Sequence, residues 1–410
     1  MNTLSLNGMN NKTRAEDLPK ATQAYPWDKA RNAVNCQFTD NGEILLPRVG
    51  KSLEYAGNVS SLFIGKAITL FSEGSSLKKL NADNTATVLK TGIGTSKVFY
   101  TEVGEVVFWA NETKTGRIIN GINTEWGCPR PDRQPDCSAV ANGGLYAGDY
   151  RVAITWLSGE QESGTGNSVR VTVPENGGIH LTNFQTPPTS VDGLAIYMSS
   201  VNGEELYLYA EYSWSLSDVT LTKRVLSVPL ATQFMLKPFP SKTVCSHNGR
   251  IYYADKQQVY FTEPHNYGLQ QANNYLSFDS DVKVIISTPP ALYVGTEKQL
   301  YKITGFDLPE DQAPQLEVLQ SCSSVAGSEC YDPNGNDGYC LTSRGFMKFS
   351  PDGVTELSYA DCAIPLFTDG TMQVTEHDGL KYLTFVGTNG TQNPLANSDY
   401  NQAELLRGSL

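Results

Sequence analysis

Six segments of this chain repeat one pattern: an apolar, aromatic-rich strand, a tight polar turn and a second strand. The segments begin 38, 145, 41, 48 and 41 residues apart. A hairpin that recurs about every 40 residues is typical of a β-propeller, because no blade can bury its own faces and stacked neighbours bury them instead. The segments are Ala67–Ser72 with Leu77–Leu80, Glu105–Ala110 with Arg117–Asn120, Arg250–Asp255 with Val259–Thr262, Ala291–Thr296 with Leu300–Thr304, Tyr339–Ser343 with Phe346–Phe349, and Leu380–Phe385.

The one long interval exceeds a blade by roughly 105 residues, which is enough for a small inserted domain. It begins at the linker Cys128–Asp136, which holds three prolines, and ends near a second proline linker, Lys237–Pro240. Short alternating strands separated by turn clusters lie between them and predict a β-sandwich of the immunoglobulin or fibronectin type. From Gly144 on, these predicted strands are Tyr150–Trp156, Ser168–Val173, Gly193–Met198 and Leu206–Glu211.

The sequence therefore predicts an all-β fold, a β-propeller interrupted by an inserted immunoglobulin- or fibronectin-like β-sandwich. Before the first blade, Asn35–Thr39 and a segment around Ile44–Arg48 read as short strands, and Thr13–Leu18, Tyr25–Val34 and Tyr400–Arg407 are the best helix candidates. The predicted parts are an N-terminal arm over 1–59, the first propeller part over 60–127, linkers and sandwich over 128–240, the second propeller part over 241–388 and a flexible tail over 389–410.

The formal net charge of −12 disfavours a sequence-independent grip on nucleic acid through a basic surface. One reading is that the negative net charge only keeps the protein soluble, which is the ordinary reading of an acidic chain. A second reading is that it lines a channel whose wall must not adhere to DNA. The N-terminus lacks a secretory pattern and no apolar run approaches the ~20 residues of a membrane span, so we expect synthesis in a cytosol. The eight cysteines include no C-x-x-C pair, which predicts buried free thiols rather than disulfides or structural zinc.

Catalytic patterns are weak. His247 and His377 occupy hairpin turns, and no histidine spacing suits a metal. The loop Asp332–Gly338 resembles a calcium loop, but Asp337 stands where an EF-hand requires glycine. Glycoside hydrolysis would need two convergent carboxylates, for which Glu102, Glu263 and Glu297 lie near blade hairpins. We therefore expect no enzyme, and no catalytic, cofactor-binding or metal-binding residues.

The N-terminal region carries a string of short motifs in a fixed order: Gly8–Asn11, Glu16–Pro19, Ala30–Asn35, Asp40–Gly42 and Pro47–Gly50. This string resembles the N-terminal region of tail tube and nozzle proteins of short-tailed bacteriophages. Later segments resemble the propeller part of the same family, namely Asn248–Tyr253, Tyr260–Pro264 with Asn266, and Leu292–Thr296 leading to Leu300, Tyr301 and Gly305. The chain departs from the family pattern at Cys36, where an aspartate is usual, and at Leu46, where a basic residue is common.

The resemblance implies a structural virion protein of the tail, assembled in the host cytoplasm. Six copies would form a ring below the portal and adaptor proteins, extend the DNA channel, retain the packaged genome and conduct it during ejection. Genomic DNA would pass without sequence-specific binding, tail fibre or plug proteins would be further partners, and no membrane is involved. A cyclic ring needs a heterologous interface, for which exposed aromatic side chains, tyrosine above all, are candidates.

We also expect the arm to dock onto neighbouring subunits or the adaptor, because polar groups in a clamp can fix register through hydrogen bonds. The docking residues predicted on this ground are Asn10, Asn11, Arg31, Asn32, Asn35 and Arg48. In the other reading, these residues only form turns and a solvated surface. Two other functions stay open: a carbohydrate-binding or carbohydrate-cleaving tail component, and a cellular propeller that serves as a scaffold for protein interactions.

Overall fold

The computed structural model describes residues 55–224, 227–305, 314–332, 336–357, 364–377, 380–388 and 390–391, together with two short N-terminal strands. These strands, β1 (Cys36–Phe38) and β2 (Leu45–Pro47), pair antiparallel where the sequence predicts two strands. The described residues contain strands and no helix, and accordingly no helical segment among them could span a membrane. The three predicted helices lie outside the described residues.

The chain divides into two compact units. One comprises Leu62–Leu80 and Thr87–Ser277, and the other comprises Met1–Ser61, Asn81–Ala86 and Phe278–Leu410.

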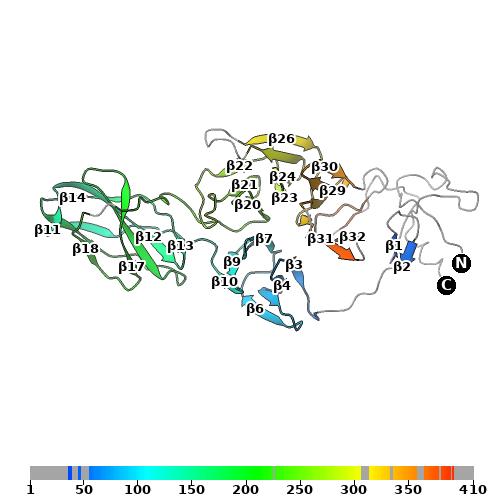
Figure 1. Cartoon of the computed structure of the whole chain (residues 1–410), viewed down its shortest axis with the longest axis horizontal. Helices are drawn as coiled ribbons and strands as arrows, with labels where there is room; N and C mark the ends of the chain where they lie inside the picture. The colour runs from blue at the N-terminus through cyan, green and yellow to red at the C-terminus, as the bar shows by residue number, and fades with distance from the viewer. Residues whose placement is uncertain are drawn as a thin grey trace, which may run out of the picture. The chain divides into compact units, whose positions relative to one another are not determined.

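Five four-stranded antiparallel sheets form the blades, and in each the strands follow one another in sequence order (Figure 1). A two-stranded sheet of β31 (Asp369–His377) and β32 (Leu380–Thr388) follows the fifth blade along the chain. The fold is thus propeller-like, as predicted. Blade 1 is β3 (Ser60–Ile64), β4 (Thr69–Glu73), β5 (Ser76–Leu80) and β6 (Ala86–Lys90); blade 2 is β7 (Phe99–Val103), β8 (Val106–Ala110), β9 (Thr115–Ile119) and β10 (Ile122–Thr124); blade 3 is β19 (Val244–His247), β20 (Arg250–Asp255), β21 (Gln258–Phe261) and β22 (Tyr275–Ser277); blade 4 is β23 (Val282–Thr288), β24 (Ala291–Thr296), β25 (Leu300–Thr304) and β26 (Gln315–Gln320); blade 5 is β27 (Cys330–Tyr331), β28 (Gly338–Thr342), β29 (Gly345–Ser350) and β30 (Gly353–Glu356).

The five complete predicted hairpins coincide with the second and third strands of the five blades. The sixth segment, Leu380–Phe385, falls on β32, but β32 pairs with the preceding strand β31. The middle strands carry the sequence signal because both of their faces are buried, which makes them nearly continuous apolar runs.

Strand β8 shows how neighbouring blades bury one another. Val107 and Trp109 pack with Leu70 and Leu77 of blade 1, and with Ile118 of their own blade. The alternate residues Phe108 and Ala110 pack instead with blade 3, against Val244, Ile251 and Tyr253. Successive side chains of a strand point to opposite faces, so a run of apolar residues fills two interfaces at once.

The second compact unit repeats this arrangement. Tyr293 of β24 packs with Cys340 and Phe349 of blade 5 in one buried cluster. On the other face of blade 5, Tyr339 packs with Met372 and Val374 of β31. Each interface within the unit is therefore built from alternate residues of the middle strands.

The insertion is a two-sheet sandwich, as predicted. Ile179, Leu181 and Leu221 of one sheet pack with Ile154 and Ile196 of the other in a shared core. A three-stranded sheet has the order β11-β15-β18, and a five-stranded sheet has the order β13-β12-β16-β17 with β14 also paired to β12. The strands are β11 (Asp136–Leu145), β12 (Gly148–Ser158), β13 (Gln161–Glu162), β14 (Val169–Val173), β15 (Gly177–Thr182), β16 (Gly193–Ser199), β17 (Leu206–Ser213) and β18 (Val219–Leu221).

The start of the sandwich differs from the prediction. Strand β11 begins at Asp136, directly after the last linker proline, rather than after Gly144. The small and polar residues of this segment, Ala-Val-Ala-Asn-Gly-Gly, lack a clear alternation. The strand pairs with β15 over Asp136–Val140 and at Leu145, and the four residues between them lie in a register shift. Bulged strands of this kind carry a weak sequence signal.

The chain leaves and re-enters the blades through a hydrogen-bonded junction. The indole Nε1 of Trp126 donates to the carbonyl oxygen of Tyr267 at 2.6 Å. The amide of Gly127 donates to Oε1 of Gln161 at 2.9 Å, and Nε2 of Gln161 donates to the carbonyl oxygen of Glu125 at 3.2 Å. Three segments distant in sequence are thereby fixed to one another where the insertion begins.

Candidate functional site

The predicted docking residues of the arm lie outside the residues whose side chains the structure describes. These residues are Asn10, Asn11, Arg31, Asn32, Asn35 and Arg48. Their docking role stays a prediction.

The last strand of each blade is a candidate interaction surface. We call β6, β10, β22, β26 and β30 the outer strands, since each ends its sheet. Four of them expose a large apolar side chain: Val88 on β6, Ile122 on β10, Tyr275 on β22 and Leu316 on β26. On blade 5 the exposed residue is Leu357, directly after β30. An exposed apolar side chain on a strand that ends its sheet suits contact with another chain, because the edge also offers backbone hydrogen-bonding groups.

Most tyrosines are not on this surface. Tyr252, Tyr253 and Tyr293 are among the largest fully buried side chains, whereas Tyr275 is exposed on an outer strand. Exposed tyrosines stay candidates for an interface, and the aliphatic side chains of the outer strands were not predicted from the sequence. The available signal was positional: each of the five predicted hairpins is followed by one more strand, after a short turn in blades 1, 2 and 5 and after a longer segment in blades 3 and 4.

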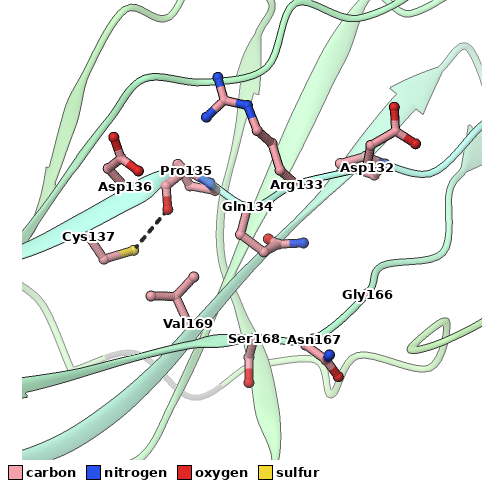
Figure 2. A pocket seen from close by; sticks show the side chains of 11 residues that line it. Asp132, Arg133, Gln134, Pro135, Asp136, Cys137, Gly166, Asn167, Ser168 and Val169 are labelled. Carbon is pink, nitrogen blue, oxygen red and sulfur yellow. Dashed lines mark hydrogen bonds between the residues drawn. The ribbon is translucent and has the colours of Figure 1, made fainter.

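The insertion carries a cavity of about 590 Å³ between residues 131–137 and 166–169 (Figure 2). Gln134 links the two walls, because its Nε2 donates to Oγ1 of Thr165 at 2.9 Å while its Oε1 accepts from the amide of Ile154 at 2.7 Å. On the other side of the linker, Arg133 donates to Oδ1 of Asn183 at 3.0 Å. These hydrogen bonds fix the proline linker against neighbouring segments of the insertion, so the cavity is bordered by a fixed polar wall.

The cysteine of the cavity, Cys137, is a poor candidate for a nucleophile. Burial raises the pKa of the Cys137 thiol to about 11, and its Sγ contacts the carbonyl oxygen of Pro135 at 3.6 Å (Figure 2). A thiol with a raised pKa is a poor nucleophile at neutral pH. The polar wall and open mouth can receive a polar side chain or a short peptide segment.

The three carboxylates considered for glycoside hydrolysis each have a local partner. Glu102 accepts from the amide of Lys66 at 3.0 Å, and Glu263 accepts from Nδ2 of Asn274 at 2.7 Å. Glu297 forms an ion pair with Lys283 at 2.7 Å, and this hydrogen bond lowers the pKa of Glu297. A general acid requires the opposite shift.

The loop that resembles a calcium site has lysine partners for its described carboxylates. Asp332, whose side chain is 1 % exposed, pairs with Lys381, and Asp337 pairs with Lys348 at 2.8 Å. Within the described residues, no group of three or more His, Cys, Asp or Glu side chains could hold a metal ion. Lysine ammonium groups thus supply the positive charge that a cation would bring.

The six cysteines that the structure describes are free thiols, as predicted, and all except Cys137 are buried. Burial raises the pKa of both Cys128 and Cys330 to about 12. These thiols therefore act as small apolar core residues.

No protein-family model matches the chain, and no curated protein matches it either. Among solved structures, the extracellular domain of a protein described as a hybrid two-component system of B. thetaiotaomicron is similar, with a TM-score of 0.31 and 12 % identity over 82 % of this chain. This chain spans 38 % of the length of that structure. BBS1N in complex with ARL6DN has a TM-score of 0.31 at 9 % identity, covering 82 % of this chain and 92 % of that one. Citrobacter koseri AztD has a TM-score of 0.27 at 10 % identity, covering 78 % of each chain. Likeness at this level carries no argument about function.

Proposed function

We propose that this chain is a structural subunit of the tail nozzle of a short-tailed bacteriophage. Copies assemble into a ring, in the family's pattern a hexamer, beneath the portal and adaptor proteins. The ring extends the DNA channel, retains the packaged genome and conducts it during ejection. The ordered motifs from Gly8 to Gly50 support the family, and the propeller-like fold with one inserted sandwich is compatible with it.

The observation that carries the proposal is the apolar outer strands. Ring assembly needs lateral surfaces on a rigid body that bind another copy. Blade after blade presents an exposed aliphatic or aromatic residue at the end of its sheet, from Val88 on β6 to Leu316 on β26. The buried middle strands give these surfaces a rigid base, since blade faces are filled by neighbouring blades.

The charge of the chain fits a conduit. A net charge of −12 on each copy repels duplex phosphates, so DNA can slide through a ring without adhering. Retention of the genome then depends on a physical constriction or a plug protein. The insertion, with its polar cavity, offers a surface for a fibre or plug protein.

Docking by the arm is tested with the variant Arg31→Ala/Arg48→Ala. We expect it to fold normally but to lose assembly onto a portal–adaptor complex, measured by co-sedimentation and electron microscopy. Lys114→Ala/Arg130→Ala is the matched control, because both of its side chains are exposed on the described surface. Normal assembly of the arm variant would refute the docking role.

A second function, carbohydrate binding by a tail component, is favoured by one feature. The rings of Tyr253, Tyr260 and Tyr275 follow one another at centroid distances of 5.9 and 5.8 Å, and Tyr275 is exposed. Aromatic faces can stack on sugar rings. Binding of host glycans by the native chain and its loss in Tyr275→Ala, measured by calorimetry, would support this function, and absence of binding would reject it.

A further inference from the structure

Two outer strands differ from the rest in length. β6 has five residues and β26 has six, whereas β10, β22 and β30 have three, three and four. A sheet edge presents backbone N–H and C=O groups to other chains, and proteins usually blunt such edges by keeping them short or charged. β6 and β26 are therefore the outer strands best able to pair with another strand.

Strand β26 is exposed on both faces over Gln315–Val318. Leu316 and Val318 lie on one face, 48 % and 52 % exposed. Their partners across the sheet on β25, Ile303 and Tyr301, are 0 % and 5 % exposed. This face is therefore buried on β25 but exposed on β26. A further strand paired with β26 would cover Leu316 and Val318. On β6, Thr87 and Val88 are exposed in the same way.

The two strands lie in sequence stretches of opposite charge. From Lys66 to Lys97, around β6, the chain has five lysines and two acidic residues. From Lys302 to Arg344, around β26, it has seven acidic and two basic residues, and Lys302 lies opposite Glu317 across the sheet. Glu317 of β26 is exposed, and the side chain of Lys90, the last residue of β6, is 42 % exposed. Opposite charge on two apolar edges of matched length favours contact between them and disfavours contact of either with itself.

We propose that β6 of one copy pairs edge to edge with β26 of the next copy. The contact is heterologous, because its two sides are different surfaces of the chain, so repetition yields a ring or a filament. The inference rests on the proposed function, in that it names the surface through which the subunits of the ring bind. Val88 packs against Leu316 and Val318, while lysines of blade 1 face Glu317.

Cysteine cross-linking tests the contact. The variants Val88→Cys/Leu316→Cys and Val88→Cys/Val318→Cys are made in a Cys36→Ser/Cys362→Ser background and oxidised mildly. Residues opposite each other in an antiparallel pair bring their Cβ atoms within reach of a disulfide. We expect at least one double variant to give a ladder of covalent oligomers on non-reducing gels, and each single variant to stay uncross-linked.

The control is Ile64→Cys/Leu316→Cys, because Ile64 is also exposed but lies on β3, at the opposite end of the blade-1 sheet from β6. A ladder from this control, or covalent dimers from Leu316→Cys alone, would overturn the proposed pairing. As a second measurement, Val318→Lys should weaken self-association roughly tenfold in mass photometry, the effect expected of a central interface residue, whereas Ile64→Lys should not.

The oligomeric state of the unmodified protein separates the nozzle function from the pairing of β6 with β26. This state is measured for the protein alone and for the protein mixed with a portal–adaptor complex, and cross-linking is performed in each sample that contains oligomers. Oligomers without any ladder, and with Val318→Lys unaffected, would refute the strand pairing and leave the nozzle function standing. A protein that stays monomeric in both samples and gives no ladder would refute both.

Discussion

Trp109 occupies the space that a β-carbon on Gly116 would need. The two residues lie opposite each other on β8 and β9, and a Cβ on Gly116 would lie 2.6 Å from Cε2 and Nε1 of the indole. The ring is fully buried, and its Nε1 donates to Oδ1 of Asn123 at 2.8 Å. Blade 2 thus closes its contact with blade 1 by laying a large aromatic ring flat on a glycine.

This relationship predicts a cost for Gly116→Ala. The hydrogen bond to Asn123 and the surrounding core prevent the indole from moving away, so overpacking should lower the free energy of unfolding by about 1–3 kcal/mol. The change is measured as a lower midpoint in chemical denaturation followed by tryptophan fluorescence. Gly166→Ala is the control, because a Cβ there meets no atom within 4 Å, and its midpoint should stay level or rise slightly.

The junction predicts a second glycine effect. Gly127 has a φ of +82°, and a Cβ there would lie 2.4 Å from the carbonyl oxygen of Gly268. Gly127→Ala should lower stability by about 1–3 kcal/mol and speed proteolysis in the linkers that flank the insertion. Gly92 has a similar φ of +68°, but a Cβ there would meet no atom within 4 Å, so Gly92→Ala measures the backbone strain without the clash. Equal proteolysis rates in the two variants would argue against a packed junction.

Stability should fall at alkaline pH. Burial raises the pKa of Cys128 and of Cys330 to about 12, and burial, followed by the hydrogen bond to Asp279, raises the pKa of Tyr301 to about 12. Because the folded-state pKa values are raised, this stabilisation is complete below the unfolded values, near 9 for thiols and 10 for tyrosine. It is lost as the pH rises toward 12. Denaturation midpoints measured from pH 8 to 11 should decline, and a constant midpoint would contradict the burial of these groups.

The ion pair of Asp332 and Lys381 predicts a specific loss of stability. Lys381→Met leaves the carboxylate of Asp332 buried without its lysine partner, which is costly. The denaturation midpoint should fall further than in Lys283→Met, whose partner Glu297 is 51 % exposed. Calcium should not restore the Lys381→Met variant. Restoration by millimolar calcium would show that the loop is a cation site after all.

The blades could be predicted from the sequence because their middle strands are buried on both faces. Val106–Ala110 is apolar throughout, and its neighbours are set off by glycine and asparagine turns. The flanking strands gave little signal: β22 has three residues and exposes Tyr275, so nothing in its pattern distinguishes it from a loop. Strand β11 was missed because its residues are small and its pairing is bulged.

The candidate interaction surface could not be predicted in the same way. Val88 and Leu316 look like core residues in sequence, and only the order of strands in each sheet shows that they end it. Among the described tyrosines, Tyr146, Tyr275 and Tyr331 are exposed, whereas Tyr253 and Tyr293 are buried in the blades, and the sequence around them does not separate the two groups. Exposure is a property of the whole sheet, so a short pattern cannot report it.

The central claim is that copies of this chain form a ring through which DNA passes. Electron microscopy of the purified protein, alone and mixed with a portal–adaptor complex, tests it most directly. We expect closed rings with a central opening wide enough for a DNA duplex in at least one of the two samples. Single, separate particles in both samples would contradict it.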